Sequence, residues 1–110
     1  MLERAMTFAR SERREKVNTE LRSRVAALRE WPLEQLAALP EAKTESAQVA
    51  GRTVKFTVFR EPQPDGGFLI AIRSDEPVLF GLITMGATEG FLVTPDGAKR
   101  EAPEKLMREY

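Results

Sequence analysis

Neither cysteine nor histidine occurs in this sequence of 110 residues. Without cysteine, the chain has no disulfide, no thiol nucleophile and no cysteine ligand for a metal. Without histidine, it lacks the side chain that most often acts as an acid or base near neutral pH and most often binds metals. These absences exclude histidine-based catalytic triads and the common zinc sites, and we expect no metal and no cofactor.

Long apolar runs and an excess of one charge are also missing. The longest apolar run, VLFGLITMG at residues 78–86, is far shorter than the roughly 20 residues of a membrane helix. The 17 basic residues balance 17 acidic ones, so no net charge attracts nucleic acid. Charges at Glu3, Arg4 and Arg10 interrupt any apolar core of a signal peptide. We expect a cytoplasmic protein that binds neither membranes nor nucleic acid.

The remaining composition fits a small folded domain. Apolar residues make up 42% and charged residues 31% of the chain, as in ordinary globular proteins. A chain of this length buries roughly two-thirds of its unfolded surface, enough for a core without metal or disulfide. We expect residues 11–110 to form a single α+β domain and residues 1–10 to form a loosely attached N-terminal arm.

The first third of the chain has the periodicity of a helix. Val17, Leu21, Val25 and Leu28 recur at intervals that place them on one helix side. Ser11 is the expected N-cap, and a helix that is continuous from residue 2 is the alternative.

Prolines divide the next segment. Trp31 precedes Pro32, which disfavours helical geometry at Trp31, so the first helix should stop there. Pro32 then starts a short second helix, which Pro40 ends. The polar residues 40–48 are expected to form a loop.

From residue 49 the side chains alternate with a period of two, which is typical of strands. The tetrads QPDG at 63–66 and TPDG at 94–97 match type I turns with glycine at positive φ, and each predicts a hairpin with a bulge. The first turn should place Val58 opposite Ile72, and the second should place Val93 opposite Lys99. In that register one face carries Val54, Phe56, Val58, Phe68, Ile70 and Ile72, and the other carries Lys55, Thr57, Phe59, Leu69, Ala71 and Arg73.

Between the hairpins, residues 78–85 are expected to form a strand that is apolar on both faces. SDEP at 74–77 and GATEG at 86–90 should be the turns that bound it. Such a strand needs cover on both sides, from helices, from a curved sheet or from a second copy of the protein.

After the second turn, the charged segment 98–102 suits an edge strand, where charge discourages pairing with other chains. Residues 102–110 should form a short helix whose Leu106, Met107 and Tyr110 dock on the sheet.

All strand connections are too short for parallel crossovers. We therefore expect an α+β fold in which an N-terminal helix and a short second helix pack on a four- to five-stranded antiparallel meander, followed by a short C-terminal helix.

The leading functional hypothesis is a non-enzymatic domain that acts through protein association, as a homodimer. Its basis is the apolar surplus on both faces of residues 78–85 and on the second face of the first hairpin, which a two-fold contact would bury. The interface candidates are Phe59, Leu69, Leu79, Ile83 and Met85.

The alternative is a binding domain for a small apolar ligand in the concave face of the sheet. The pocket candidates are Phe56, Val58, Ile70, Ile72, Phe80, Leu82 and Phe91. The same residues would equally form a plain core, because pockets are few per protein.

Two other functions have weaker support. Arg60, Glu61, Arg73 and Glu89 lie near predicted strand ends and are the candidates for carboxylate catalysis, although solvated surface charges are the simpler interpretation. The basic residues of the first helix are interleaved with glutamates, which is typical of a solvated helix face and not of a nucleic-acid interface. These basic residues are Arg10, Arg13, Arg14, Lys16, Arg22, Arg24 and Arg29.

Overall fold

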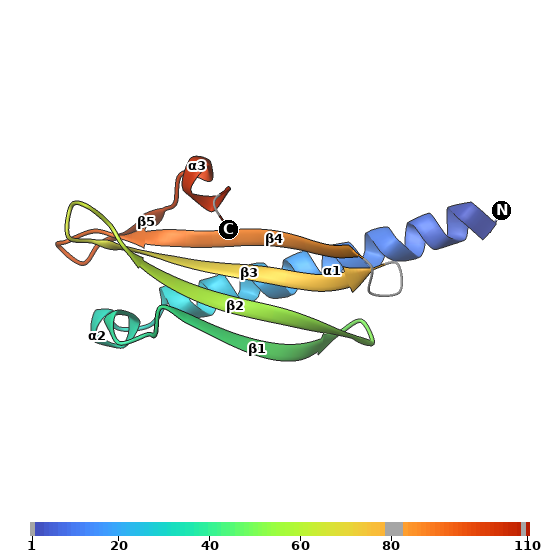
Figure 1. Cartoon of the computed structure of the whole chain (residues 1–110), viewed down its shortest axis with the longest axis horizontal. Coiled ribbons are helices and arrows are strands. Elements are labelled where there is room, and N and C mark those ends of the chain that lie inside the picture. The colour runs from blue at the N-terminus through green and yellow to red at the C-terminus, as the bar shows by residue number, and fades with distance from the viewer. Residues whose placement is uncertain (1, 79–82, 109) are drawn as a thin grey trace.

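The computed structural model describes residues 2–78, 83–108 and 110, and it has the expected α+β fold. The helices are α1 (Leu2–Arg29), α2 (Leu33–Ala37) and α3 (Glu104–Met107), and the strands are β1 (Ala42–Val49), β2 (Arg52–Pro62), β3 (Phe68–Val78), β4 (Ile83–Val93) and β5 (Lys99–Glu101). The strands form one antiparallel meander in the order β1-β2-β3-β4-β5. Helix α1 runs along the sheet, and the molecule measures 55 × 24 × 23 Å (Figure 1).

Helix α1 packs on the sheet through the predicted apolar stripe. Val17, Leu21 and Leu28 are buried, and Val25 packs against the same core cluster. The prediction of an N-cap at Ser11 is wrong, because the helix begins at Leu2 and passes through Ser11 without interruption. The first turns of α1 extend beyond the sheet (Figure 1), and the loose attachment of residues 1–10 stays a prediction.

The segment after α1 contains one confirmed element and one correction. Helix α2 follows Pro32, which is its N-cap, and it inserts Leu36 into the core. Residues 40–48 were predicted to be a loop, but Ala42–Val49 form β1, paired along its whole length with β2. A tight turn joins the two strands, with Ala50 at φ 52° and Gly51 at φ 77°. Positive φ at both central residues matches the right-handed twist of a two-residue hairpin.

Both Pro-Asp-Gly corners are hairpin turns, as predicted. In the first, the Gln63 amide donates to the Gly67 carbonyl at 2.8 Å, and in the second the Thr94 amide donates to the Ala98 carbonyl at 2.8 Å. Their glycines take φ values of 93° and 88°, which side chains rarely tolerate. The predicted registers are confirmed: Val58 pairs with Ile72, and Val93 pairs with Lys99.

The second corner also perturbs a carboxyl group. The Thr94 hydroxyl donates to the Asp96 carboxylate, and this bond, followed by the one from the Ala98 amide, lowers the pKa of Asp96 from its ordinary value of 3.8. Because the folded pKa is lowered, the bond stabilises the folded state above pH 3.8, and this contribution is lost as the pH falls through the lowered value.

We expect Thr94→Val to raise the pKa of Asp96 towards its ordinary value, because the variant removes the largest cause of the shift. A carboxyl ¹³C NMR titration measures this change directly. Thr88→Val, a substitution in the middle of β4, is the matched control and should leave the Asp96 titration unchanged. An Asp96 midpoint that is identical in the wild type and in Thr94→Val would contradict the assigned cause.

The region between the hairpins differs from the prediction. SDEP lies inside β3 and GATEG lies inside β4, so neither is a turn. Val78 pairs with Ile83, so the run predicted as one doubly apolar strand contributes to the ends of two neighbouring strands. Residues 79–82 of that run lie outside the described residues. The remaining register follows without a break to Phe68 opposite Val93.

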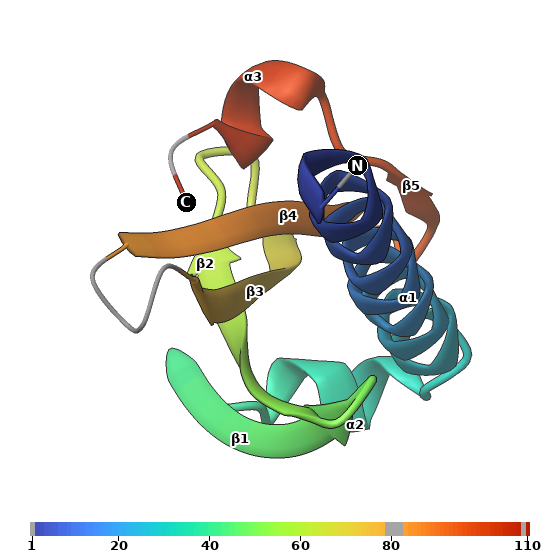
Figure 2. The same ribbon diagram turned by 90° about the vertical axis from the view of Figure 1, so that its right-hand side faces the viewer.

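The core lies between α1 and one face of the sheet. Its buried residues are Val17, Leu21, Leu28, Leu36, Val54, Phe56, Ile70, Ile72, Phe91 and Val93. On the opposite face, Leu69 and Ala71 are also buried, and the Tyr110 ring lies 4.9 Å from the Phe59 ring. Helix α3 lies at the top of the end view, above β4 (Figure 2). Among the described residues, no helix is both long enough and apolar enough to cross a membrane.

Candidate functional site

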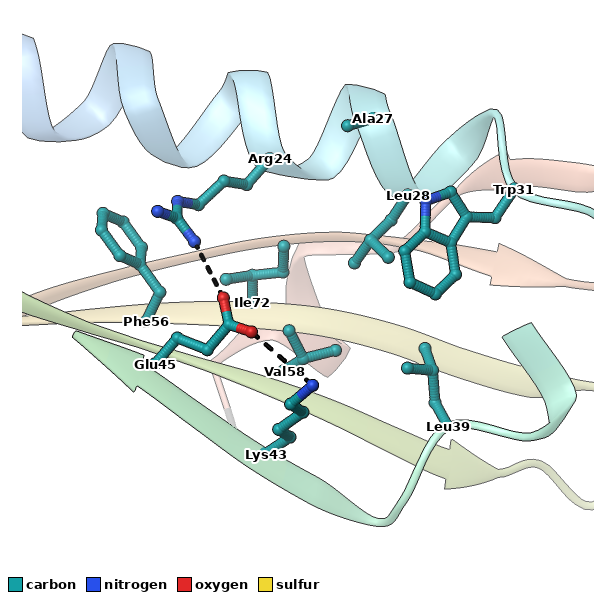
Figure 3. A pocket seen from close by; sticks show the side chains of 10 residues that line it. All are labelled: Arg24, Ala27, Leu28, Trp31, Leu39, Lys43, Glu45, Phe56, Val58 and Ile72. Atoms are coloured by element: carbon teal, nitrogen blue, oxygen red, sulfur yellow. Dashed lines mark ion pairs between the residues drawn. The ribbon is translucent and has the colours of Figure 1, made fainter. Parts of the chain in front are cut away.

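A cavity of about 200 Å³ opens between α1 and the β1–β2 edge of the sheet. The residues that line it are Arg24, Ala27, Leu28, Trp31, Leu39, Lys43, Glu45, Phe56, Val58 and Ile72 (Figure 3). They come from the second half of α1, the segments around α2, and strands β1, β2 and β3. The cavity is open to solvent, and four of its lining residues are exposed: Ala27, Trp31, Lys43 and Glu45. A concave, mostly apolar surface with a few polar groups is the usual form of a ligand site.

Charged residues form one side of the cavity. The Arg24 guanidinium lies 4.3 Å from the centroid of the Phe56 ring, in cation–π contact. It also forms an ion pair with Glu20 at 3.0 Å. A second ion pair joins it to Glu45 at 3.5 Å, and Glu45 in turn pairs with Lys43 at 3.6 Å (Figure 3). The cavity therefore has an apolar interior beside a chain of mutually paired charges.

Trp31 lies at the end of the cavity where α1 stops. Its side chain is 38% exposed, although tryptophan usually contributes to cores and interfaces. The Lys99 ammonium fixes the local backbone by donating to the Trp31 carbonyl at 2.7 Å and to the Arg29 carbonyl at 2.6 Å. Since Trp31 is the only tryptophan of the chain, its fluorescence reports on this cavity alone.

The structure brings together some of the predicted pocket residues. Phe56, Val58 and Ile72 line the cavity, whereas Ile70 and Phe91 are fully buried in the core and do not line it. Phe80 and Leu82 lie outside the described residues. The concave face of the sheet thus supplies one wall of the cavity.

The other walls were missed by the sequence analysis. Lys43 and Glu45 belong to a segment that was predicted to be a loop, and Ala27 and Arg24 lie beside the apolar stripe of α1. A lone tryptophan next to a helix-ending proline was the one signal in the sequence that pointed to this end of α1.

Of the residues predicted to form a dimer interface, those whose side chains the structure describes do not lie on one face, since Phe59 and Leu69 share one side of the sheet and Met85 lies on the other. Leu69 is buried at 1% exposure, and Phe59 is partly covered through its contact with Tyr110. Met85 is 46% exposed. Leu79 and the side chain of Ile83 lie outside the described residues. Among the described candidates, Leu69 is therefore part of the folded core, whereas Met85 remains exposed.

Near the opposite end of the interface between α1 and the sheet lies a group of buried polar residues. Glu76 is 4% exposed and lies 3.8 Å from the Arg14 guanidinium, which also donates to the Gly86 carbonyl at 2.9 Å. Ser74 is buried and bonds to the Ala87 backbone. Arg14 and Arg24 therefore contact the sheet, so the basic residues of α1 do not share one solvent-facing surface.

The candidate catalytic set is not assembled. Arg60 lies on the α1 side of the sheet and donates to the Leu39 carbonyl at 2.6 Å, and Glu89, paired with Ile72, shares that side. Glu61 and Arg73 lie on the other side, where Glu61 accepts a bond from Tyr110 and Arg73 pairs with Asp75 at 3.0 Å. In the described part of the chain, no group of three or more acidic residues could hold a metal ion.

The arrangement in the cavity is suited to binding. Its lining has no hydroxyl or thiol group that could act as a nucleophile, and its charged residues are already paired with one another.

No family model matches the chain, and neither the curated proteins nor the solved structures contain a significant match to it.

Proposed function

We propose that this domain binds a small apolar ligand in the cavity between α1 and the β1–β2 edge. The observation that supports the proposal is an open space of about 200 Å³ whose lining is mainly aliphatic and aromatic. A ligand pocket combines such a lining with a few polar groups that orient the ligand. Arg24, Lys43 and Glu45 supply those groups here.

The volume limits the ligand. An apolar cavity of about 150 Å³ in another protein binds benzene, so the present cavity suits one aromatic ring with a small substituent, or a short alkyl chain. Phe56 and Trp31 offer ring faces and edges to an aromatic ligand. Such aromatic contacts contribute about 0.5–1.5 kcal/mol of binding free energy beyond the contribution of the buried apolar area.

Trp31 fluorescence provides the test. Bromobenzene has the size of the expected ligand, and its bromine quenches indole fluorescence on contact. We expect saturable quenching of the wild type, because bound bromobenzene would lie against Trp31. A ligand at about ten times its Kd also stabilises the folded state by about 1.4 kcal/mol, which should raise Tm by several degrees.

Two neighbouring alanines provide matched variants. Ala27 lines the cavity, whereas Ala26 does not, and both are exposed residues of α1. Ala27→Phe should fill the cavity and leave only linear, collisional quenching, and Ala26→Phe should behave like the wild type. Linear quenching in all three proteins, with no shift of Tm, would refute the proposal.

Association as a homodimer is the second candidate function. The described residues do not support the interface first expected for it, but the exposed edge of β1 is a different surface that supports association.

A further inference from the structure

Among the residues that the structure describes, no strand pairs with the outer edge of β1, which presents a row of backbone groups. β1 is the first strand of the sheet, has eight residues, and is exposed throughout Ala42–Ser46. The other edge strand, β5, has only three residues. A long exposed edge is a template for pairing with another strand, and natural proteins usually block it with charges, prolines or bulges.

The alternation of hydrogen bonds between β1 and β2 shows which residues of β1 point their backbone amides and carbonyls away from the sheet. The Arg60 amide donates to the Glu41 carbonyl at 3.0 Å. Glu41 and Arg60 extend by one residue the register in which Ala42 pairs with Phe59, so they lie opposite one another. Bonded pairs alternate with non-bonded pairs in an antiparallel ladder. Lys43 and Glu45 therefore bond to β2, whereas the amides and carbonyls of Ala42, Thr44 and Ser46 point away from the sheet.

The side chains that flank Thr44 have opposite charge. Lys43 precedes it and Glu45 follows it, and their side chains are 59% and 57% exposed. If a second β1 paired antiparallel about Thr44, each Lys43 would lie opposite a Glu45 of the second copy. These would be non-bonded pairs, in which Cα atoms approach to about 4.5 Å and side chains interact most closely.

Neighbouring registers lack this match. A centre at Glu45 would place two glutamates opposite each other, and a centre at Lys43 would place two lysines opposite each other, both of which are destabilising. A centre at Ser46 would place the charged residues opposite Ala47 and Val49. The charges of Lys43 and Glu45 therefore oppose most pairings of β1 with another strand. They attract one another across the edge only when two copies of β1 pair about Thr44.

We propose that two copies of this chain associate through β1, in an antiparallel register centred on Thr44, and join their sheets into one. The two-fold axis is perpendicular to the sheet, so both α1 helices lie on the same side. Lys43 and Glu45 also line the cavity, so the two cavities lie on either side of the junction. The dimer does not depend on ligand binding.

The absence of cysteine makes the register directly testable. Thr44→Cys introduces the only thiol of the chain, and two such residues would lie opposite each other, within the Cα separation of about 5.5 Å that a disulfide requires. We expect nearly complete cross-linked dimer after mild oxidation. Ser46→Cys is the control, because its two copies would lie about 14 Å apart along the strands at 3.4 Å per residue. Cross-linking of Ser46→Cys equal to that of Thr44→Cys would overturn the register.

Charge reversal tests the pairing without covalent chemistry. Lys43→Glu and Glu45→Lys should each weaken self-association roughly tenfold, because two opposite-charge pairs become like-charge pairs. Mixing the two variants should restore dimers, and so should combining them in one chain. Sedimentation equilibrium of the wild type, the variants and the mixture measures this, with circular dichroism to confirm folding. A monomeric wild type at about 100 µM, or two single variants that dimerise like the wild type, would refute the proposal.

Discussion

Leu21→Asp is expected to destabilise the folded protein severely. Leu21 is 1% exposed and lies in the middle of the α1 stripe that packs on the sheet. An aspartate there would place an unpaired charge in an apolar interface. We expect a loss of about 4 kcal/mol or more, a large part of the roughly 5–15 kcal/mol that stabilises a typical domain. Circular dichroism at room temperature and urea unfolding would measure the loss.

Two controls separate this effect from a general weakening of α1. Arg22→Asp changes the adjacent residue, which is exposed, and should alter the free energy of unfolding by less than about 1 kcal/mol. Deleting residues 1–8 should also cost little, because the first turns of α1 extend beyond the sheet (Figure 1). If the deletion unfolds the protein and Leu21→Asp does not, the assignment of the buried helix face is wrong.

Phe56→Ala is expected to have the second largest effect. Phe56 is 1% exposed, faces α1 from β2, and supports the Arg24 guanidinium. Removing a buried phenylalanine ring costs about 3–5 kcal/mol through lost burial and the space left behind. The vacated space adjoins the existing cavity, so the variant should bind larger apolar probes than the wild type.

Phe59 provides the comparison for this variant. It lies on the same strand but on the opposite face, where it is half-buried against Tyr110. Phe59→Ala should lose less stability than Phe56→Ala and should leave bromobenzene quenching of Trp31 unchanged. Urea unfolding and fluorescence titration of both variants measure these differences. An equal or larger loss in Phe59→Ala would contradict the assignment of Phe56 to the core.

The sequence predicted those parts of the fold whose signals are local. The Pro-Asp-Gly corners determine turn type, turn type determines register, and the register places Val54, Phe56, Ile70 and Ile72 on one buried face. The four-residue spacing between Val17 and Leu21 likewise gives the buried side of α1. In these segments the local turn chemistry and the apolar pattern agree, and such agreement makes a sequence specific for one structure.

The prediction failed where strands lack an apolar alternation. The first five residues of β1 are all exposed, so its strand conformation depends on pairing with β2, which its composition does not reveal. Ala50 at φ 52° is also an unusual residue for a tight turn.

The prediction for residues 86–90 of β4 was wrong because their glycines were interpreted as turn residues. Gly86 and Gly90 were assigned to a turn, but both lie within the strand. A side-chain carbon at Gly90 would lie 2.3 Å from the Ile70 carbonyl oxygen, and one at Gly86 would lie 2.7 Å from the Ser74 carbonyl oxygen. These glycines permit close approach of β3 and β4. Sequence alone does not distinguish this role from a turn.

The candidate site was only partly predictable because it combines distant segments. Phe56, Val58 and Ile72 follow from the sheet register. Arg24 and Glu45 meet only because β1 lies beside the second half of α1. The cavity therefore depends on tertiary packing that no short pattern in the chain specifies.

The elongated outline of the molecule affects how its assembly must be measured. Its radius of gyration is 15.7 Å, compared with about 13 Å for a compact domain of this length, and α1 projects past the sheet (Figure 1). A rod experiences more friction than a sphere of equal mass, so a single chain will elute from a gel-filtration column earlier than a compact domain of the same mass. Methods that report mass independently of shape will distinguish one chain from two.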